Sequence, residues 1–189
     1  MHLDEVASPR AALVLGHGAG GGVEAPDLLA ARDAAVAEGV AVARVEQPYR
    51  VAGRRSSPRA PVLDAAWTAV LARLSSDELA GMPLVTGGRS AGARVACRTA
   101  GATGPAAVLC LAFPLEPPRR GDKPPQSRLD ELDAVGVPVL VVQGDRDRFG
   151  MPPPGRSREV VVVPGDHGLK ADLEAVGTAV RTWLAAVVR

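Results

Sequence analysis

The sequence lacks a large net charge of either sign and any long hydrophobic run. Its 22 basic and 21 acidic residues leave a formal charge of +1. This balance gives no electrostatic reason to expect nucleic acid or an anionic membrane as a partner, and we predict neither. No run approaches the roughly 18 apolar residues of a membrane span. The first ten residues, MHLDEVASPR, also lack the apolar core of a secretory signal, so we predict a cytoplasmic protein.

Cysteine and aromatic residues are scarce as well. Cys97 and Cys110 lie in apolar surroundings and form neither a metal-ligand spacing nor a CxxC motif. We therefore expect buried, reduced thiols, as is usual in the cytoplasm, and neither a metal nor a cofactor. Aromatic residues make up 3% of the chain, which favours a small, soluble substrate over a long lipid.

Apolar residues, by contrast, are plentiful and occur in short runs. With 189 residues, 47% of them hydrophobic, the chain is long enough for one buried core and short for two, so we predict a single domain over 1–189. Most of the runs are apolar throughout, which is typical of strands covered on both faces of a parallel sheet. The runs lie at 11–16, 40–46, 83–87, 106–113, 138–143 and 159–163.

Segments with helical spacing alternate with these predicted strands. Large apolar residues recur on one face of 61–74 and of 170–188, and Pro26 is suited to open a further helix. Two stretches rich in proline and arginine, 47–61 and 114–128, are predicted to be solvated loops. The alternation predicts an α/β three-layer sandwich with a mostly parallel sheet of about six strands.

The stretch LGHGAGGG, residues 15–22, has two interpretations. Its glycines fit the G-x-G-x-x-G turn of a dinucleotide-binding oxidoreductase, with Glu46 placed as a ribose-binding acid. The same loop is suited to direct backbone N–H groups toward an oxyanion. In a dinucleotide fold the helix begins within the glycine motif, whereas Pro26 places the helix start beyond Gly21. We therefore favour the oxyanion interpretation.

A second motif lies where the predicted strand 83–87 leads into a helix. Residues 88–92, GRSAG, fit the G-x-S-x-G pattern and place Ser90 at a strand-to-helix turn. Gly88 and Gly92 are needed because larger side chains there would collide with neighbouring backbone. The strained turn presents the hydroxyl at the start of a helix whose first N–H groups have no partner within the helix. Ser90 is therefore a candidate nucleophile.

A serine nucleophile needs a base, which is usually an imidazole held by a carboxylate. Of the three histidines, His2 lies at the amino terminus and His17 in the glycine loop, whereas His167 directly follows the apolar run 159–163. Because these strands end at the same edge of the sheet, His167 is the candidate base.

The acid should follow another strand that lies between the serine and the histidine in the chain. Asp145 and Asp147 both follow the run 138–143, and their spacing does not separate them. Asp166, next to the histidine, is better suited to form a turn.

These motifs resemble the α/β-hydrolase superfamily. They are most similar in style to small dienelactone-hydrolase-like predicted hydrolases, which include a testis-expressed animal protein and a hydrolase-like domain in the nonspecific-lethal histone acetyltransferase complex. The segments that carry the resemblance are HGAGGG, EQPYR, GGRSAGAR, AFPLEPP, VQGDRDRFG and GDHGLK. In that family the acid ends a G-x-x-D pattern, so the resemblance implies Asp147. Dienelactone hydrolases proper have a cysteine at the position of Ser90, so neither their nucleophile nor their substrate transfers.

We therefore expect an α/β-hydrolase fold and a serine hydrolase that acts on a small acyl substrate. About twenty residues separate Phe113 from the next strand, too few for a lid domain. The alternative is a binding or scaffold protein that keeps the fold without turnover. The chemistry is assigned to the following residues: Ser90, His167 and Asp147 as the triad, backbone N–H groups of Ala91 and Ala19 as the oxyanion hole, and His17, Gly18, Gly88 and Gly92 as supporting residues. Tyr49, Arg50 and Phe149 are candidates to line the pocket. The sequence does not specify an oligomeric state.

Overall fold

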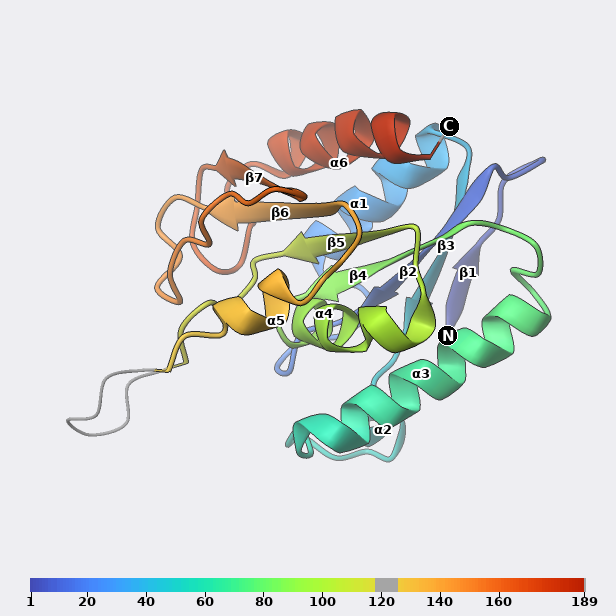
Figure 1. The fold of residues 1–189 in the computed structure, drawn as a ribbon, viewed down its shortest axis with the longest axis horizontal. Helices are drawn as coiled ribbons and strands as arrows, with labels where there is room; N and C mark the ends of the chain where they lie inside the picture. Colours follow the sequence, from blue (N-terminus) through green and yellow to red (C-terminus); the bar gives the residue numbers. More distant parts are fainter. Residues whose placement is uncertain (118–125, 189) are drawn as a thin grey trace.

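A computed structural model describes residues 1–117 and 126–188 as a seven-stranded sheet with helices on both faces (Figure 1). The strands are β1 (His2–Asp4), β2 (Ala11–Gly16), β3 (Val40–Val45), β4 (Leu84–Arg89), β5 (Ala107–Leu111), β6 (Val139–Gly144) and β7 (Arg158–Val163). The helices are α1 (Pro26–Ala37), α2 (Pro48–Val51), α3 (Ala60–Ser76), α4 (Ala91–Thr103), α5 (Leu129–Asp133) and α6 (Leu173–Val187). The sheet order is β1-β3-β2-β4-β5-β6-β7, and only β1 pairs antiparallel among these strands.

The central strands are buried on both faces, as their continuous apolar runs predict. Every residue of β2, β3, β5 and β6 is buried. The helices form two outer layers: α1 and α6 lie together on one face, and α3, α4 and α5 lie on the other (Figure 1). Trp183 is buried in the core under α1 and α6, and Trp67 in the core under α3. The predicted three-layer sandwich is therefore confirmed.

Three short elements do not appear in the prediction. Strand β1 has no apolar run and is fixed by pairing with β3, where Leu3 lies opposite Ala43. Helix α2 falls within 47–61, which was predicted to be a loop; Pro48 at its start has the fixed φ that a first helical turn requires. Helix α5 begins just after the second proline-rich stretch, of which 118–125 lie outside the described residues.

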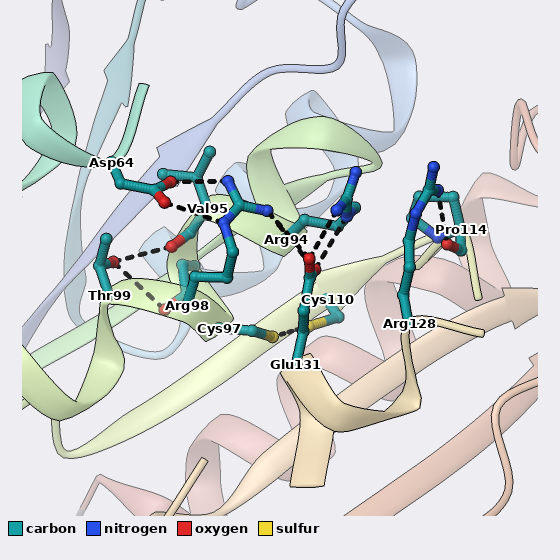
Figure 2. A network of polar contacts seen from close by, with 11 residues as sticks. Asp64, Arg94, Val95, Cys97, Arg98, Thr99, Cys110, Pro114, Arg128 and Glu131 are labelled. Carbon is teal, nitrogen blue, oxygen red and sulfur yellow. Dashed lines mark hydrogen bonds and ion pairs between the residues drawn. The ribbon is translucent and has the colours of Figure 1, made fainter. Parts of the chain in front are cut away.

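Ion pairs join the three helices on one face of the sheet (Figure 2). Arg98 of α4 donates to both carboxylate oxygens of Asp64 in α3, at 2.6 and 2.9 Å. Arg94, one turn earlier, donates to both oxygens of Glu131 in α5, at 2.5 and 2.8 Å. Arg98 also reaches Glu131 at 3.4 Å. We refer to Asp64, Arg94, Arg98 and Glu131 as the helix ion-pair cluster.

The chain order creates a switch point beside β2. After β2 the chain continues to β3 on one side, and it then crosses back to β4 on the other side of β2. In open α/β sheets, ligands bind at the carboxyl ends of strands that flank such a point. The glycine loop follows β2 and Ser90 follows β4, so both lie there. Within the described ranges, no helix is long and apolar enough to cross a membrane, and no lid domain separates β5 from β6.

Candidate active site

Ser90 occupies a strained turn between β4 and α4. Its φ of 52° and ψ of −107° lie outside the regions that non-glycine residues ordinarily adopt. Such strain persists where the surroundings fix it, and here the Ser90 N–H donates to the carbonyl of Leu111 at 2.9 Å. A Cβ atom on either Gly88 or Gly92 would collide with the carbonyl oxygen of Gly16. The two glycines therefore let β4 and α4 approach β2 closely, as the G-x-S-x-G motif predicts.

The structure brings Ser90, His167 and Asp147 together from three separate strand ends. Ser90 Oγ lies 2.9 Å from His167 Nε2, and His167 Nδ1 lies 2.8 Å from Asp147 Oδ2. Both distances fall within hydrogen-bonding range. Because the Asp147 carboxylate accepts from Nδ1, the proton of a neutral His167 resides there and Nε2 is left free to accept from the serine hydroxyl. The arrangement can therefore move a proton from Ser90 to His167.

The same contacts distinguish the three candidate acids. The Asp147 side chain is fully buried, whereas that of Asp145 is 45% exposed. Asp145 accepts the N–H of Gly165 at 2.7 Å, which ties the loop before the histidine to β6. Asp166 accepts the N–H of Gly168 at 2.8 Å and so forms a turn. Only Asp147 of these three bonds the imidazole, in agreement with the choice that the family resemblance implied.

Two further residues hold the acid and the imidazole. Gln143, buried at the end of β6, donates its amide to Asp147 Oδ2 at 2.9 Å, and the N–H of Phe149 donates to Oδ1 at 2.9 Å. The Phe149 ring lies edge-on to His167, with centroids 4.4 Å apart. Phe149 had been expected to line a pocket. Gln143 was missed, although an amide in an otherwise apolar strand was a signal in the sequence.

The glycine loop lies against the serine and is held by two side chains. A Cβ atom on Gly18 would lie 3.5 Å from Ser90 Cβ. His17 is fully buried; its Nε2 accepts the N–H of Gln47 at 3.0 Å, so its Nδ1 carries the proton and donates to the Gly18 carbonyl at 2.8 Å. Burial lowers the pKa of His17 below 6.5, so the ring is neutral. The Tyr49 hydroxyl donates to the Ala19 carbonyl at 2.9 Å.

These bonds fix both peptide groups that flank Ala19. In a trans peptide the Gly18 carbonyl and the Ala19 N–H point in opposite directions, so holding the carbonyl also orients the N–H. Tyr49, expected to line a pocket, is therefore part of the loop's support. Ala19 is exposed, and Ala91 is the first residue of α4, where backbone N–H groups have no acceptor within the helix. Helix α1 begins at Pro26, so the glycine motif does not open a helix as in a dinucleotide fold.

Comparison with known proteins identifies the family of the chain. A family model described as "Alpha/beta hydrolase domain" matches residues 9–185, so the chain belongs to the α/β-hydrolase family. No curated protein matches the sequence.

Similar solved structures include Est1E from Butyrivibrio proteoclasticus bound to ferulic acid, with a TM-score of 0.79 and 18% identity over 99% of this chain and 94% of that one. XC6422 from Xanthomonas campestris, described as a serine hydrolase without lid, has a TM-score of 0.77 and 20% identity over 98% and 88%. A dienelactone hydrolase from Anabaena variabilis has a TM-score of 0.76 and 16% identity over 99% and 91%. These structures share the α/β-hydrolase fold with the chain.

Proposed function

We propose that this protein is a serine hydrolase that cleaves a small acyl ester through Ser90, His167 and Asp147. The observation that carries the proposal is the continuous chain of hydrogen bonds from the buried Asp147 carboxylate through His167 to the Ser90 hydroxyl. The family membership supports a hydrolytic reaction, and similar solved structures include one described as an esterase domain from a Rhodothermus marinus protein. Ser90 lies at the switch point of the sheet, and the binding of ligands at such points in open α/β sheets supports the proposal.

The reaction proceeds in two acyl-transfer steps. His167 Nε2 accepts the Ser90 proton while Oγ attacks the carbonyl carbon, which forms a tetrahedral oxyanion. The oxyanion collapses, the C–O bond to the alcohol breaks, and His167 returns the proton to the departing oxygen. Water then attacks the acyl-serine with the same base, which releases the acid and restores the hydroxyl. Asp147 holds the imidazole tautomer and stabilises the imidazolium in both steps.

The N–H groups of Ala91 and Ala19 are assigned to the developing oxyanion. Ala91 offers a free N–H of the first turn of α4, and the positive end of a helix dipole favours negative charge there. Ala19 offers an N–H whose peptide plane is held by His17. A donor fixed before the reaction does not need to reorganise during it, and loss of one such donor costs about 3–4 kcal/mol of transition-state stabilisation.

The substrate class follows from the open site and the composition. Among the described residues no lid domain covers Ser90, which supports small, water-soluble esters over long lipids. A single domain, a cytoplasmic location and the absence of nucleic-acid and membrane partners stay predictions from length, charge and cysteine content.

A fluorophosphonate probe tests the proposal directly, because it phosphonylates an activated serine. We expect stoichiometric labelling of the folded protein at Ser90, no labelling of Ser90→Ala, and labelling of His167→Ala slowed by about 10³-fold or more. Urea denaturation shows whether each variant is folded. A folded wild-type protein that gives no adduct at Ser90 would contradict the proposal and favour a scaffold role. A panel of p-nitrophenyl esters of increasing chain length then defines the acyl preference.

A further inference from the structure

The residue before the serine, Arg89, makes contacts that the proposed reaction does not use. Its Nη2 donates to the backbone carbonyl of His167 at 2.8 Å. Its Nε lies 2.8 Å from Oδ2 of Asp27 in α1. Its Nη1 faces the glycine loop so closely that a Cβ on Gly18 would come within 2.8 Å of it. One guanidinium therefore contacts α1, the histidine loop and the glycine loop from the end of β4.

Its partner Asp27 is unusually buried for an acidic residue in the first turn of a helix. Acidic residues in a first turn are ordinarily exposed and interact with the helix dipole, but this side chain is 1% exposed. Burial raises the pKa of Asp27, and the charge of Arg89 opposes that rise. The other oxygen accepts the N–H of Leu28 at 3.1 Å. A carboxylate this buried needs a cationic partner. The ion pair with Asp27 therefore fixes the orientation of the Arg89 guanidinium.

We propose that Arg89, aligned by Asp27, is a positioning residue for the site. The inference rests on the proposed function. By holding the His167 carbonyl, Arg89 restrains the backbone from which the imidazole projects between Ser90 and Asp147. By packing against Gly18, it restrains the loop that presents the Ala19 N–H. Its hydrogen bond and ion pair go to the His167 carbonyl and to Asp27, and among the described residues it makes neither with the Ser90 hydroxyl, the His167 imidazole or the Asp147 carboxylate.

Only arginine can meet these demands together. Its planar guanidinium has donors in fixed directions, so one edge can face Asp27 while another reaches the His167 carbonyl. A lysine ammonium can pair with the carboxylate but is a single point on a flexible stem. Glycine at position 18 suits this arrangement, because a Cβ atom there would lie 2.8 Å from Nη1 and crowd the guanidinium.

The experiment separates positioning from stability by comparing four proteins: Arg89→Lys, Arg89→Met, Arg89→Ala and the double variant Asp27→Asn/Arg89→Met. Each is measured by its fluorophosphonate labelling rate, by kcat and KM for p-nitrophenyl acetate, and by its urea midpoint. Arg98→Lys serves as the control, because Arg98 is a paired arginine on a helix outside the site. We expect Arg98→Lys to label at the wild-type rate.

Arg89→Lys is expected to stay folded and to lose about 10–100-fold in kcat, with KM within about twofold, because misplacement of a reacting group by about 1 Å costs on that order. Arg89→Met leaves Asp27 buried without its cation and should lower the urea midpoint. The double variant leaves no buried charge unpaired, so its midpoint should recover while kcat stays low. Millimolar methylguanidinium should partly restore the labelling rate of Arg89→Ala, which a purely structural role would not predict.

The outcomes separate the two proposals. Recovery of both the midpoint and kcat in the double variant would make the pair a stability device and overturn this inference. Equal labelling of wild type and Arg89→Lys would also overturn it, while the serine hydrolase stands. Absence of labelling in the wild type overturns the proposed function itself, and the inference with it. Should Arg89→Met not fold, Arg89→Lys and the double variant still carry the test.

Discussion

The molecule has two groups of interacting charges that differ in redundancy. In the helix ion-pair cluster every side chain is 17–25% exposed, Glu131 accepts from two arginines and Arg98 pairs with two carboxylates (Figure 2). At the strand ends the Asp147 side chain is fully buried. Within the described residues, a single hydrogen bond joins it to His167. Loss of one contact in the helix cluster leaves others in place. Loss of one contact at the strand ends interrupts the chain of hydrogen bonds from Asp147 through His167 to Ser90.

The two groups contribute differently to stability and to reaction rate. Partly exposed, shared ion pairs are weakened by solvent screening, and they spread a modest contribution to folding over several contacts. A buried carboxylate held by three donors is costly to desolvate and fixes one geometry. Changes in the helix ion-pair cluster should therefore alter the free energy of unfolding and leave kcat unchanged. Changes in the strand-end groups should mainly lower kcat.

Replacing Asp147 by Asn should have the largest effect on rate. The amide cannot stabilise the imidazolium and favours the wrong tautomer of His167, which in comparable triads lowers kcat by about 10⁴-fold. The measurement is steady-state hydrolysis of a p-nitrophenyl ester. Asp145→Asn is the matched control: it keeps the oxygen that accepts the Gly165 N–H, so kcat should change by less than about threefold. A larger loss in Asp145→Asn than in Asp147→Asn would reverse the assignment of the acid.

Deleting the Ala19 N–H should have the next largest effect. Ala19→Pro removes the proposed oxyanion donor, and we expect kcat to fall by about 10²–10³-fold. Ala19→Ser keeps the N–H and is the control, expected to retain activity. Stopped-flow acylation kinetics would locate the loss in the chemical step. Similar kcat values for the two variants would show that a different backbone amide faces the oxyanion.

Breaking the helix cluster should change stability instead. Glu131→Gln removes the negative charge that Arg94 and Arg98 share, and hydrogen bonds to charged groups contribute about 1.5–3 kcal/mol. Arg98 keeps Asp64, so we expect a loss of about 1–2 kcal/mol in the free energy of unfolding, from urea titration. The labelling rate at Ser90 should match wild type. A fall in labelling without a fall in stability would contradict the division between the two groups.

The central strands could be predicted from the sequence because burial on both faces requires apolar residues at consecutive positions. A strand such as β5, buried at every position, is apolar throughout, so its run is visible without knowledge of its neighbours. Strand β1 has no such run, since its place depends on backbone pairing with β3. Helix α2 is too short for a periodic pattern and lies among prolines, which favour loops elsewhere.

The site was predictable where one motif fixes one residue. Ser90 and His167 follow from a strained turn and a strand end, and each is near its predicted place. Asp147 could not be separated from Asp145 by spacing; what distinguishes them is that the Gly165 N–H engages Asp145, a contact that exists only in the folded chain. Asp27 reads as an ordinary first-turn acid, and its pairing with Arg89 depends on how α1 lies over β4.

Titration of His17 should have the smallest effect of the changes considered. This histidine lies beside the strand-end groups, but we expect it to affect the free energy of unfolding, as the helix ion-pair cluster does. Burial lowers its pKa below 6.5, so under mildly acidic conditions the unfolded chain binds a proton there that the folded chain does not. Stability is therefore complete above pH 6.5 and falls as the pH drops below it, by at most about 1.4 kcal/mol per pH unit for one proton. Protonation would also abolish the acceptor for the Gln47 N–H.

We expect urea titrations between pH 7.5 and 5.5 to show a steeper fall in the free energy of unfolding for wild type than for His17→Asn. Because His2 and His167 are present in both proteins, the difference reports His17 alone. Equal slopes would mean that the folded protein tolerates a charged His17, and the loop that presents Ala19 would then need another support.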